Sequence, residues 1–161
     1  MLSQRIEHDE LINLLPHKGK MFLLSRVISY DIKTYSITTE YDISKECIFY
    51  EPENDGVPCW AAFELMAQSI SAMSGIAHHI RGDSPLPGVI LSVVGFDSSV
   101  SYFKNNTTVR ISVSQDFMDE ATRVSRYICR LYTSPDDEAP SVTANLSVME
   151  VQDASAFFAE N

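Results

Sequence analysis

The chain has 161 residues, of which 45% are hydrophobic and 21% are charged, so its composition predicts one globular domain. Twelve Lys and Arg residues against 22 Asp and Glu residues give a formal net charge of -10, which argues against nucleic acid or an anionic membrane as the main partner. The three cysteines form no C-x-x-C pair and have no histidine at zinc-ligand spacing. We therefore expect no bound metal and a reducing compartment.

The sequence predicts neither a secretory signal nor a membrane-spanning helix. The first twenty residues contain Pro16 and several charges but no apolar run long enough for a secretory signal, so a cytoplasmic location is expected. Residues 57–77 are the most apolar stretch, yet they include Glu64 and Gln68, whereas a membrane span needs about 20 predominantly apolar residues. We expect a buried helix there and no membrane span.

The N-terminal part of the chain predicts a short helix and two strands. Asp9 is placed to cap the helix and Pro16 to end it. Residues 21–30 are apolar and branched, and residues 34–42 alternate between apolar and polar side chains, as a half-buried strand does. The residues between these two segments predict a hairpin turn.

The rest of the chain predicts one long helix followed by strands. Residues 44–58 are rich in turn-forming residues and lead into a helix over residues 59–79, about 30 Å long. Extended segments follow, and short turns between them predict antiparallel pairing. These segments are 89–103, 107–117, 122–133 and 141–151. Residues 1–151 would then form a single domain, and residues 152–161 a loosely held tail.

A single long helix beside about six antiparallel strands has no second helix to pack on, so the sheet itself must wrap the helix. The helix sequence agrees, because Glu64 is its only charged side chain between Cys59 and Ala77 and no face of it suits water. The predicted fold class is therefore α+β, with one central helix inside a curved antiparallel sheet.

Glu64 is the candidate general acid. A carboxylate enclosed by a sheet loses hydration, which favours its protonated form and suits it to donate a proton. Two structural alternatives stand beside this hypothesis: an ion pair with an arginine of a strand, or a place at the helix start facing solvent, where the helix dipole stabilises it. Gln68 lies one turn later on the same face, where it either orients Glu64 or a ligand, or is a buried amide bonded to the backbone.

Other polar residues have two interpretations each. His17 either caps the carbonyl groups of the preceding helix or takes part in chemistry, and His78 and His79 suit the end of the long helix. No nucleophile elbow, Walker loop or dinucleotide motif is present. Two basic groups are either docking sites for an acidic partner or solvated faces. The first contains Lys18, Lys20 and Arg26, and the second contains Arg123, Arg126 and Arg130.

Two stretches carry a family resemblance: LLPHKGKMFLLSRV at residues 14–27 and DGVPCWAAFELMAQ at residues 55–68. They resemble the "LLPHR-x-PFLLVDRV" and "MPGV-x-x-x-EAMAQ" signatures of hotdog-fold 3-hydroxyacyl-(acyl carrier protein) dehydratases, and the spacing from Pro58 to Glu64 matches without a gap. The second stretch is most similar to the divergent dehydratase-like subunit of aryl polyene biosynthesis. The order of predicted elements matches that family over nearly the whole chain.

The resemblance implies a hotdog fold, a dimer whose two sheets join edge to edge, and an acyl-pantetheine tunnel at the subunit boundary. The implied substrate is a beta-hydroxyacyl chain on the phosphopantetheine of an acyl carrier protein, with no other cofactor. In that family a histidine of one subunit removes the proton alpha to the thioester, and a carboxylate of the other, here Glu64, helps the 3-hydroxyl leave as water. The implied substrate-binding positions are Gln68, Pro58, Cys59, Trp60 and His17.

The sequence departs from the family at Tyr50, which stands where the family has its catalytic histidine. A phenol with an ordinary pKa near 10 donates a hydrogen bond at neutral pH but does not act as a base. The main hypothesis is therefore a dehydratase-type subunit that gains its base from a related partner subunit. A homodimer would need another base, such as His17 or Asp55. The alternatives are a non-catalytic subunit that stabilises a partner or holds an acyl chain, and an acyl thioesterase.

Overall fold

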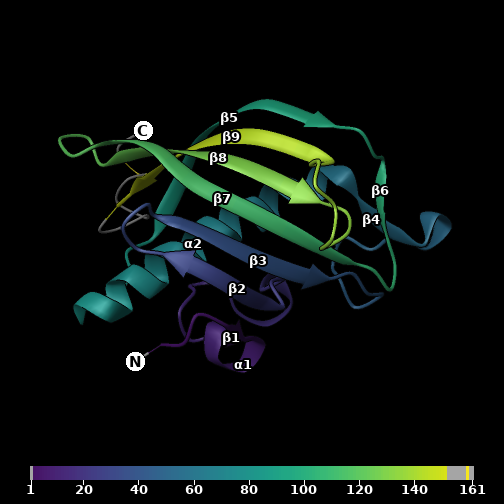
Figure 1. Cartoon of the computed structure of the whole chain (residues 1–161), viewed down its shortest axis with the longest axis horizontal. Coiled ribbons are helices and arrows are strands. Elements are labelled where there is room, and N and C mark those ends of the chain that lie inside the picture. Colours follow the sequence, from purple (N-terminus) through teal and green to yellow (C-terminus); the bar gives the residue numbers. More distant parts are fainter. Residues whose placement is uncertain (1, 152–158, 160–161) are drawn as a thin grey trace.

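A curved antiparallel sheet wraps one long helix in the computed structural model, which describes residues 2–151 and 159 (Figure 1). The seven strands of the main sheet have the order β1-β2-β3-β7-β8-β9-β5, and β4 pairs with β6 in a separate two-stranded sheet. This arrangement confirms the predicted α+β architecture. The predicted tail, residues 152–161, lies outside the described residues except for residue 159.

The strands and helices have the following bounds. The main sheet contains β1 (Ile6–Glu7), β2 (Arg26–Asp31), β3 (Ser36–Asp42), β5 (Gly88–Ser98), β7 (Thr108–Asp119), β8 (Val124–Tyr132) and β9 (Val142–Glu150). The small sheet contains β4 (Gly56–Pro58) and β6 (Tyr102–Lys104). The α-helices are α1 (His8–Leu11) and α2 (Ala62–Arg81), and 3-10 turns occur at Gly19–Met21, Pro52–Asn54 and Cys59–Ala61.

Helix α2 is enclosed along most of its length, as its sequence predicts. No side chain from Ala62 to His78 is exposed, and Leu65, Met66, Met73 and Ile76 are almost completely buried against the sheet. The helix ends at Gly82, whose left-handed φ of 79° allows its N–H to bond the carbonyl of His79. None of the helices in the described residues is long and apolar enough to pass through a lipid bilayer.

The strands that face α2 alternate as predicted. In β7, Val109, Ile111 and Val113 are buried, while the intervening residues are half-buried on the outer face. Strand β3 pairs with β7 through Ile37 opposite Val113, which continues the same apolar surface. The inner faces of β8 and β9 complete the core around the helix.

Two predicted strands have different bounds in the structure, and one strand was not predicted. Residues 89–103 form two strands in different sheets, because the chain turns after Ser98, whose hydroxyl donates to the carbonyl of Val100. The strand predicted from residue 21 begins only at Arg26, since residues 19–21 form a 3-10 turn and the N–H of Leu23 bonds a helix side chain instead of a strand. The sheet also gains β1, so it has more strands than the six expected.

The predicted cap of the first helix is wrong. Helix α1 is a single turn that starts after Glu7, and no side chain caps it by a hydrogen bond. Asp9 lies inside the helix and its carboxylate instead contacts Nδ1 of the neighbouring His8 at 3.2 Å. A one-turn helix has no need of a side-chain cap when β1 and the core fix its position.

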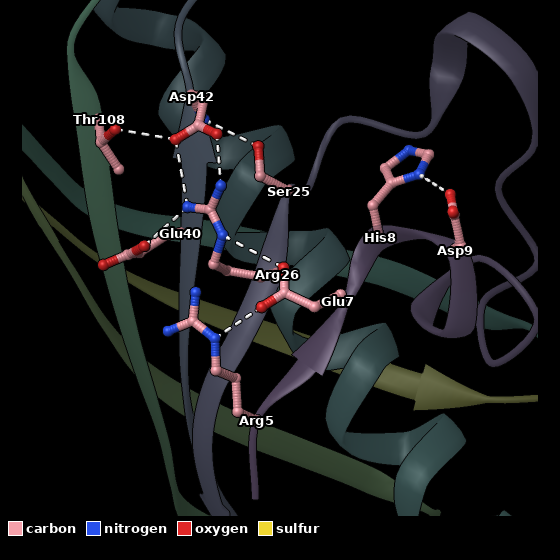
Figure 2. A network of polar contacts seen from close by, with 9 residues as sticks. All are labelled: Arg5, Glu7, His8, Asp9, Ser25, Arg26, Glu40, Asp42 and Thr108. Carbon is pink, nitrogen blue, oxygen red and sulfur yellow. Dashed lines mark hydrogen bonds and ion pairs between the residues drawn. The ribbon is translucent and has the colours of Figure 1, made fainter. Parts of the chain in front are cut away.

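An arginine network ties the first three strands together (Figure 2). Arg26 on β2 donates to both carboxylate oxygens of Asp42, at 2.5 and 3.1 Å, and to Glu40 at 2.8 Å, with Glu7 3.6 Å away. The hydrogen bond with Asp42 raises the pKa of Arg26 and lowers the pKa of Asp42. Arg26 is thus paired with carboxylates, so of the two interpretations of its basic group the docking role does not apply to Arg26.

We predict that Arg26→Met lowers the free energy of unfolding by about 1–2 kcal/mol at neutral pH, because hydrogen bonds between charged groups are lost at a partly exposed site. The lowered pKa of Asp42 contributes stability above the unfolded carboxyl pKa of about 3.9, and this contribution disappears as the pH falls through the lower folded pKa. The difference between wild type and variant should therefore shrink at about pH 3, which urea unfolding measures. The exposed Arg130 offers a control, and an equal loss in Arg130→Met would contradict the assignment.

Candidate active site

Glu64 lies in the first turn of α2, with 19% of its side chain exposed. Neither structural alternative from the sequence applies, because the carboxylate is not paired with an arginine and does not extend into solvent. Its Oε1 accepts a hydrogen bond from Nε2 of Gln68 at 3.0 Å and lies 3.6 Å from Nε2 of His17. The carboxylate is therefore enclosed as expected, with one hydrogen bond from Gln68 and the imidazole of His17 close by.

Gln68 connects the helix to the segment before β2. It is fully buried, its Oε1 accepts the N–H of Leu23 at 2.9 Å, and its Nε2 donates to the carbonyl of Met21 at 2.7 Å. The same Nε2 donates to Glu64, so one amide fills both roles that the sequence left open. Because backbone N–H and C=O groups must be paired when buried, this side chain fixes the segment beside the carboxylate.

The structure places His17 over Glu64, although the two residues are far apart in the sequence. The segment before His17 rests directly on α2 at Gly75, where a Cβ atom would lie 2.1 Å from the carbonyl oxygen of Leu14. Gly75 is about three turns beyond Glu64 on the same helix face, so the chain running along this face reaches the carboxylate. The capping role expected for His17 is taken by Lys18, whose ammonium group donates to the carbonyls of Ile12 and Leu15.

The hydroxyl of Tyr50 is bonded to Asp55, and no hydrogen bond joins it to Glu64 among the described residues. The hydroxyl donates to Oδ1 of Asp55 at 2.5 Å, and Nδ2 of Asn105 donates to the same oxygen at 3.2 Å. The hydrogen bond to Asp55 raises the pKa of Tyr50 above its ordinary value. The phenol therefore keeps its proton at neutral pH, and Asp55 is occupied as its acceptor.

The residues expected at the start of the helix have different exposures. Pro58 is buried in the small sheet, Cys59 is half-buried, and Trp60 is 49% exposed with its ring edge against Phe49. The N–H of Cys59 donates to the carbonyl of Ser101 at 2.9 Å, so this group is not free to bind a thioester oxygen. Their roles in binding a substrate stay predictions.

Histidines and arginines elsewhere have mainly structural contacts. His78 is buried near the end of α2, with Nδ1 2.6 Å from the carboxylate of Asp83, while His79 is exposed. Arg126 is paired with Asp116 at 3.0 Å, so it is no free docking group. Among residues 2–151 and 159, no group of three or more His, Cys, Asp and Glu side chains is arranged to hold a metal ion.

A cavity of about 410 Å³ lies between the later turns of α2 and the sheet. Pro16 and Ser71 form part of its wall near His17, and Tyr35 and Tyr127 contribute aromatic rings whose centroids are 6.5 Å apart. Burial raises the pKa of Tyr127, and its hydroxyl accepts a hydrogen bond from Gln115 at 3.4 Å. The sequence gives no local signal for this cavity, because its lining residues come from α2, four strands and several loops that only the folded chain brings together.

Seven antiparallel strands wrapped around one long helix, with the carboxylate on that helix, define a hotdog-fold protein. A chain of the dehydratase heterocomplex ApeI:P from Xenorhabdus doucetiae has the same fold, with a TM-score of 0.80 and 21% sequence identity over 94% of this chain and 97% of that chain. The protein belongs to the ApeP-like family, described as ApeP dehydratase, whose family model matches residues 10–159. The family resemblance found in the sequence is thereby confirmed.

Curated relatives support the same superfamily. A 3-hydroxyacyl-[acyl-carrier-protein] dehydratase FabZ from Protochlamydia amoebophila is 23% identical over 90 residues, covering 56% of this chain and 58% of the relative. A protein of the same description from Chlamydia abortus is 31% identical over 77 residues, covering 46% of this chain and 50% of the relative. The matched part of the chain thus spans about half the length of these curated relatives.

We predict that Gln68→Met lowers the free energy of unfolding by about 2 kcal/mol, because the buried N–H of Leu23 loses its acceptor. Chemical unfolding followed by circular dichroism measures the change. The matched control is Gln115→Met, since Gln115 bonds only side chains and leaves no backbone N–H unpaired. Equal losses in the two variants would show that Gln68 does not anchor the segment.

Proposed function

We propose that this protein is a dehydratase-type subunit that acts on beta-hydroxyacyl chains carried by an acyl carrier protein. The observation that carries the proposal is Glu64, the single carboxylate of the enclosed helix α2, whose Oε1 accepts a hydrogen bond from Gln68 and lies 3.6 Å from Nε2 of His17. In this reaction a base removes the proton from the carbon alpha to the thioester, and Glu64 gives a proton to the 3-hydroxyl. The carbon–oxygen bond breaks, a carbon–carbon double bond forms and water leaves.

The base comes from a second subunit in this proposal. Tyr50 occupies the position of the family histidine, and its proton is held by Asp55, so it does not abstract a proton at neutral pH. A related hotdog subunit that keeps the histidine would supply it across the interface to Glu64. The reciprocal site, which contains Tyr50, would then be silent. A dehydratase heterocomplex among the proteins of the same fold supports this arrangement.

The surface that fits such a partner is the outer edge of β5. This strand lies at one edge of the main sheet, and it exposes Ile90, Leu91, Val93, Val94 and Phe96 by 38% to 59% (Figure 1). A long apolar strand with unpaired backbone groups is a template for pairing with another strand. We therefore assign β5 to the subunit interface, where two sheets join edge to edge.

The cavity beside α2 is the proposed place of the acyl chain. Its volume of about 410 Å³ falls within the range of small-molecule sites. Glu64 itself does not line the cavity, but Pro16, next to His17, and Ser71, one turn after Gln68, do. An acyl chain whose thioester end lies at Glu64 would therefore enter the cavity past these two residues and extend along the later turns of α2. We further propose a cytoplasmic pathway of the aryl polyene kind, in which the phosphopantetheine of the carrier presents the chain.

We predict that Glu64→Gln, in the complex with its partner subunit, lowers dehydration of a beta-hydroxyacyl carrier by about 100-fold or more, because the amide has no acid proton to give. Tyr50→Phe in the same complex should stay within about twofold of wild type, since its hydroxyl is outside the working site. Enoyl product measured by mass spectrometry of the carrier tests both variants.

Three outcomes of this experiment contradict the proposal. Full activity in Glu64→Gln removes Glu64 as the acid, and loss of activity in Tyr50→Phe shows that Tyr50 takes part in the reaction. Release of free thiol from the carrier, in place of enoyl product, supports the thioesterase alternative.

We also predict that Val94→Glu prevents assembly, because a charge would be buried at the centre of the strand pair. Native mass spectrometry of the co-expressed subunits should show the complex for wild type and single chains for the variant. The control is Ile80→Glu, at a similarly exposed apolar residue near the end of α2 and not on the edge strand. If Val94→Glu still assembles, β5 is not the interface.

One observation favours a non-catalytic subunit as the second candidate. The bonding of Tyr50 to Asp55 and of Asp55 to Asn105 makes a stable polar group where a catalytic histidine would stand. In that case the chain only completes its partner, and Glu64→Ala leaves activity unchanged, whereas removal of the whole subunit lowers it.

A further inference from the structure

His17 and Gln68 approach the same oxygen of Glu64, which makes the two carboxylate oxygens unequal. The orientation of Gln68 is fixed, because the backbone N–H of Leu23 can only donate and must therefore face Oε1 of Gln68. The other end of the amide, Nε2, then donates one hydrogen to Met21 and the other to Oε1 of Glu64. Oε1 of Glu64 is thereby an acceptor.

The imidazole of His17 reinforces this inequality. Its Nε2 lies 3.6 Å from Oε1 of Glu64, within ion-pair range but longer than a hydrogen bond. Contacts of this kind often tighten only when substrate is bound. Both side chains are shielded, with 25% of His17 and 19% of Glu64 exposed. A proton on Nε2 directed at Oε1 would make it the second donor to that oxygen.

The surroundings of the other ring nitrogen indicate that His17 serves the site around Glu64 and is not needed for packing. Its Nδ1 is buried and has no hydrogen-bond partner among the described residues. An unpaired buried nitrogen is unfavourable, so a histidine kept only for packing would be replaced at no loss by an apolar side chain. The capping role is also absent, because Lys18 bonds the neighbouring carbonyl groups.

We propose that His17 is a positioning residue that acts through Glu64. With Gln68 it donates to Oε1, so the acid proton of Glu64 sits on Oε2, and Oε2 is the atom that gives its proton to the leaving hydroxyl. When that proton leaves, the negative charge on the carboxylate is stabilised by the two N–H donors at Oε1. This inference rests on the proposed dehydration. It assigns the two side chains that position Glu64, His17 and Gln68, to the same chain as the acid.

The test compares three variants in the complex with the partner subunit. His17→Phe should lower kcat by about 10- to 100-fold with KM nearly unchanged, because the lost donor acts on the acid and not on substrate binding. His17→Gln keeps an N–H donor and should recover to within about fivefold of wild type. The control is His79→Phe, an exposed histidine at the end of the same helix, which should leave kcat unchanged.

A second readout does not depend on activity. The carbon-13 signal of the Glu64 carboxyl group, identified by its loss in Glu64→Gln, should shift in His17→Phe and not in His79→Phe. If the wild-type complex shows no dehydration, the proposed function fails, while this signal still tests the pair.

The proposal is overturned by an unchanged carboxyl signal in His17→Phe, or by equal kcat losses in His17→Phe and His17→Gln. If His17→Phe does not fold, His17→Leu takes its place with the same expected results.

Discussion

The buried amide of Gln68 is the interaction on which the arrangement of this protein depends. It joins three parts of the chain that the sequence separates: the segment before β2, the first turns of α2 and the carboxylate of Glu64. Each of its polar atoms is satisfied within a water-poor environment, where hydrogen bonds are strong and an unmade one is expensive. The amide therefore fixes the segment before β2 and the position of the Glu64 carboxylate at the same time.

Much of the fold could be predicted because it follows from local patterns. The alternation in β7 and β9 and the lack of a water-facing side on α2 required a sheet around a helix, and the structure has that arrangement. The predicted strand boundaries are wrong where a side chain, and not the backbone of another strand, is the hydrogen-bond partner. The N–H of Leu23 donates to Gln68 instead of to a neighbouring strand, and the pattern of apolar residues at 21–30 does not reveal this change of partner.

The candidate site was only partly accessible from the sequence. Glu64 stood out because it is a lone charge in an apolar helix, and Gln68 because it shares the helix face. The meeting of His17 and Glu64 was not predictable from spacing, because it depends on the close approach of Leu14 to Gly75. A glycine inside a helix signals such an approach, but it does not reveal which segment approaches. The partners of Arg26 were hidden for the same reason, since they come from other strands.

The open edge of β5 has a consequence for how the protein is made. If a partner subunit covers β5 as proposed, a newly folded chain exposes an apolar strand until that partner binds, and such strands pair readily with one another into aggregates. Copies synthesised in excess over their partner would remain substrates for chaperones and proteases. If the chain works in the proposed complex, the cell would have to match the supply of the two polypeptides.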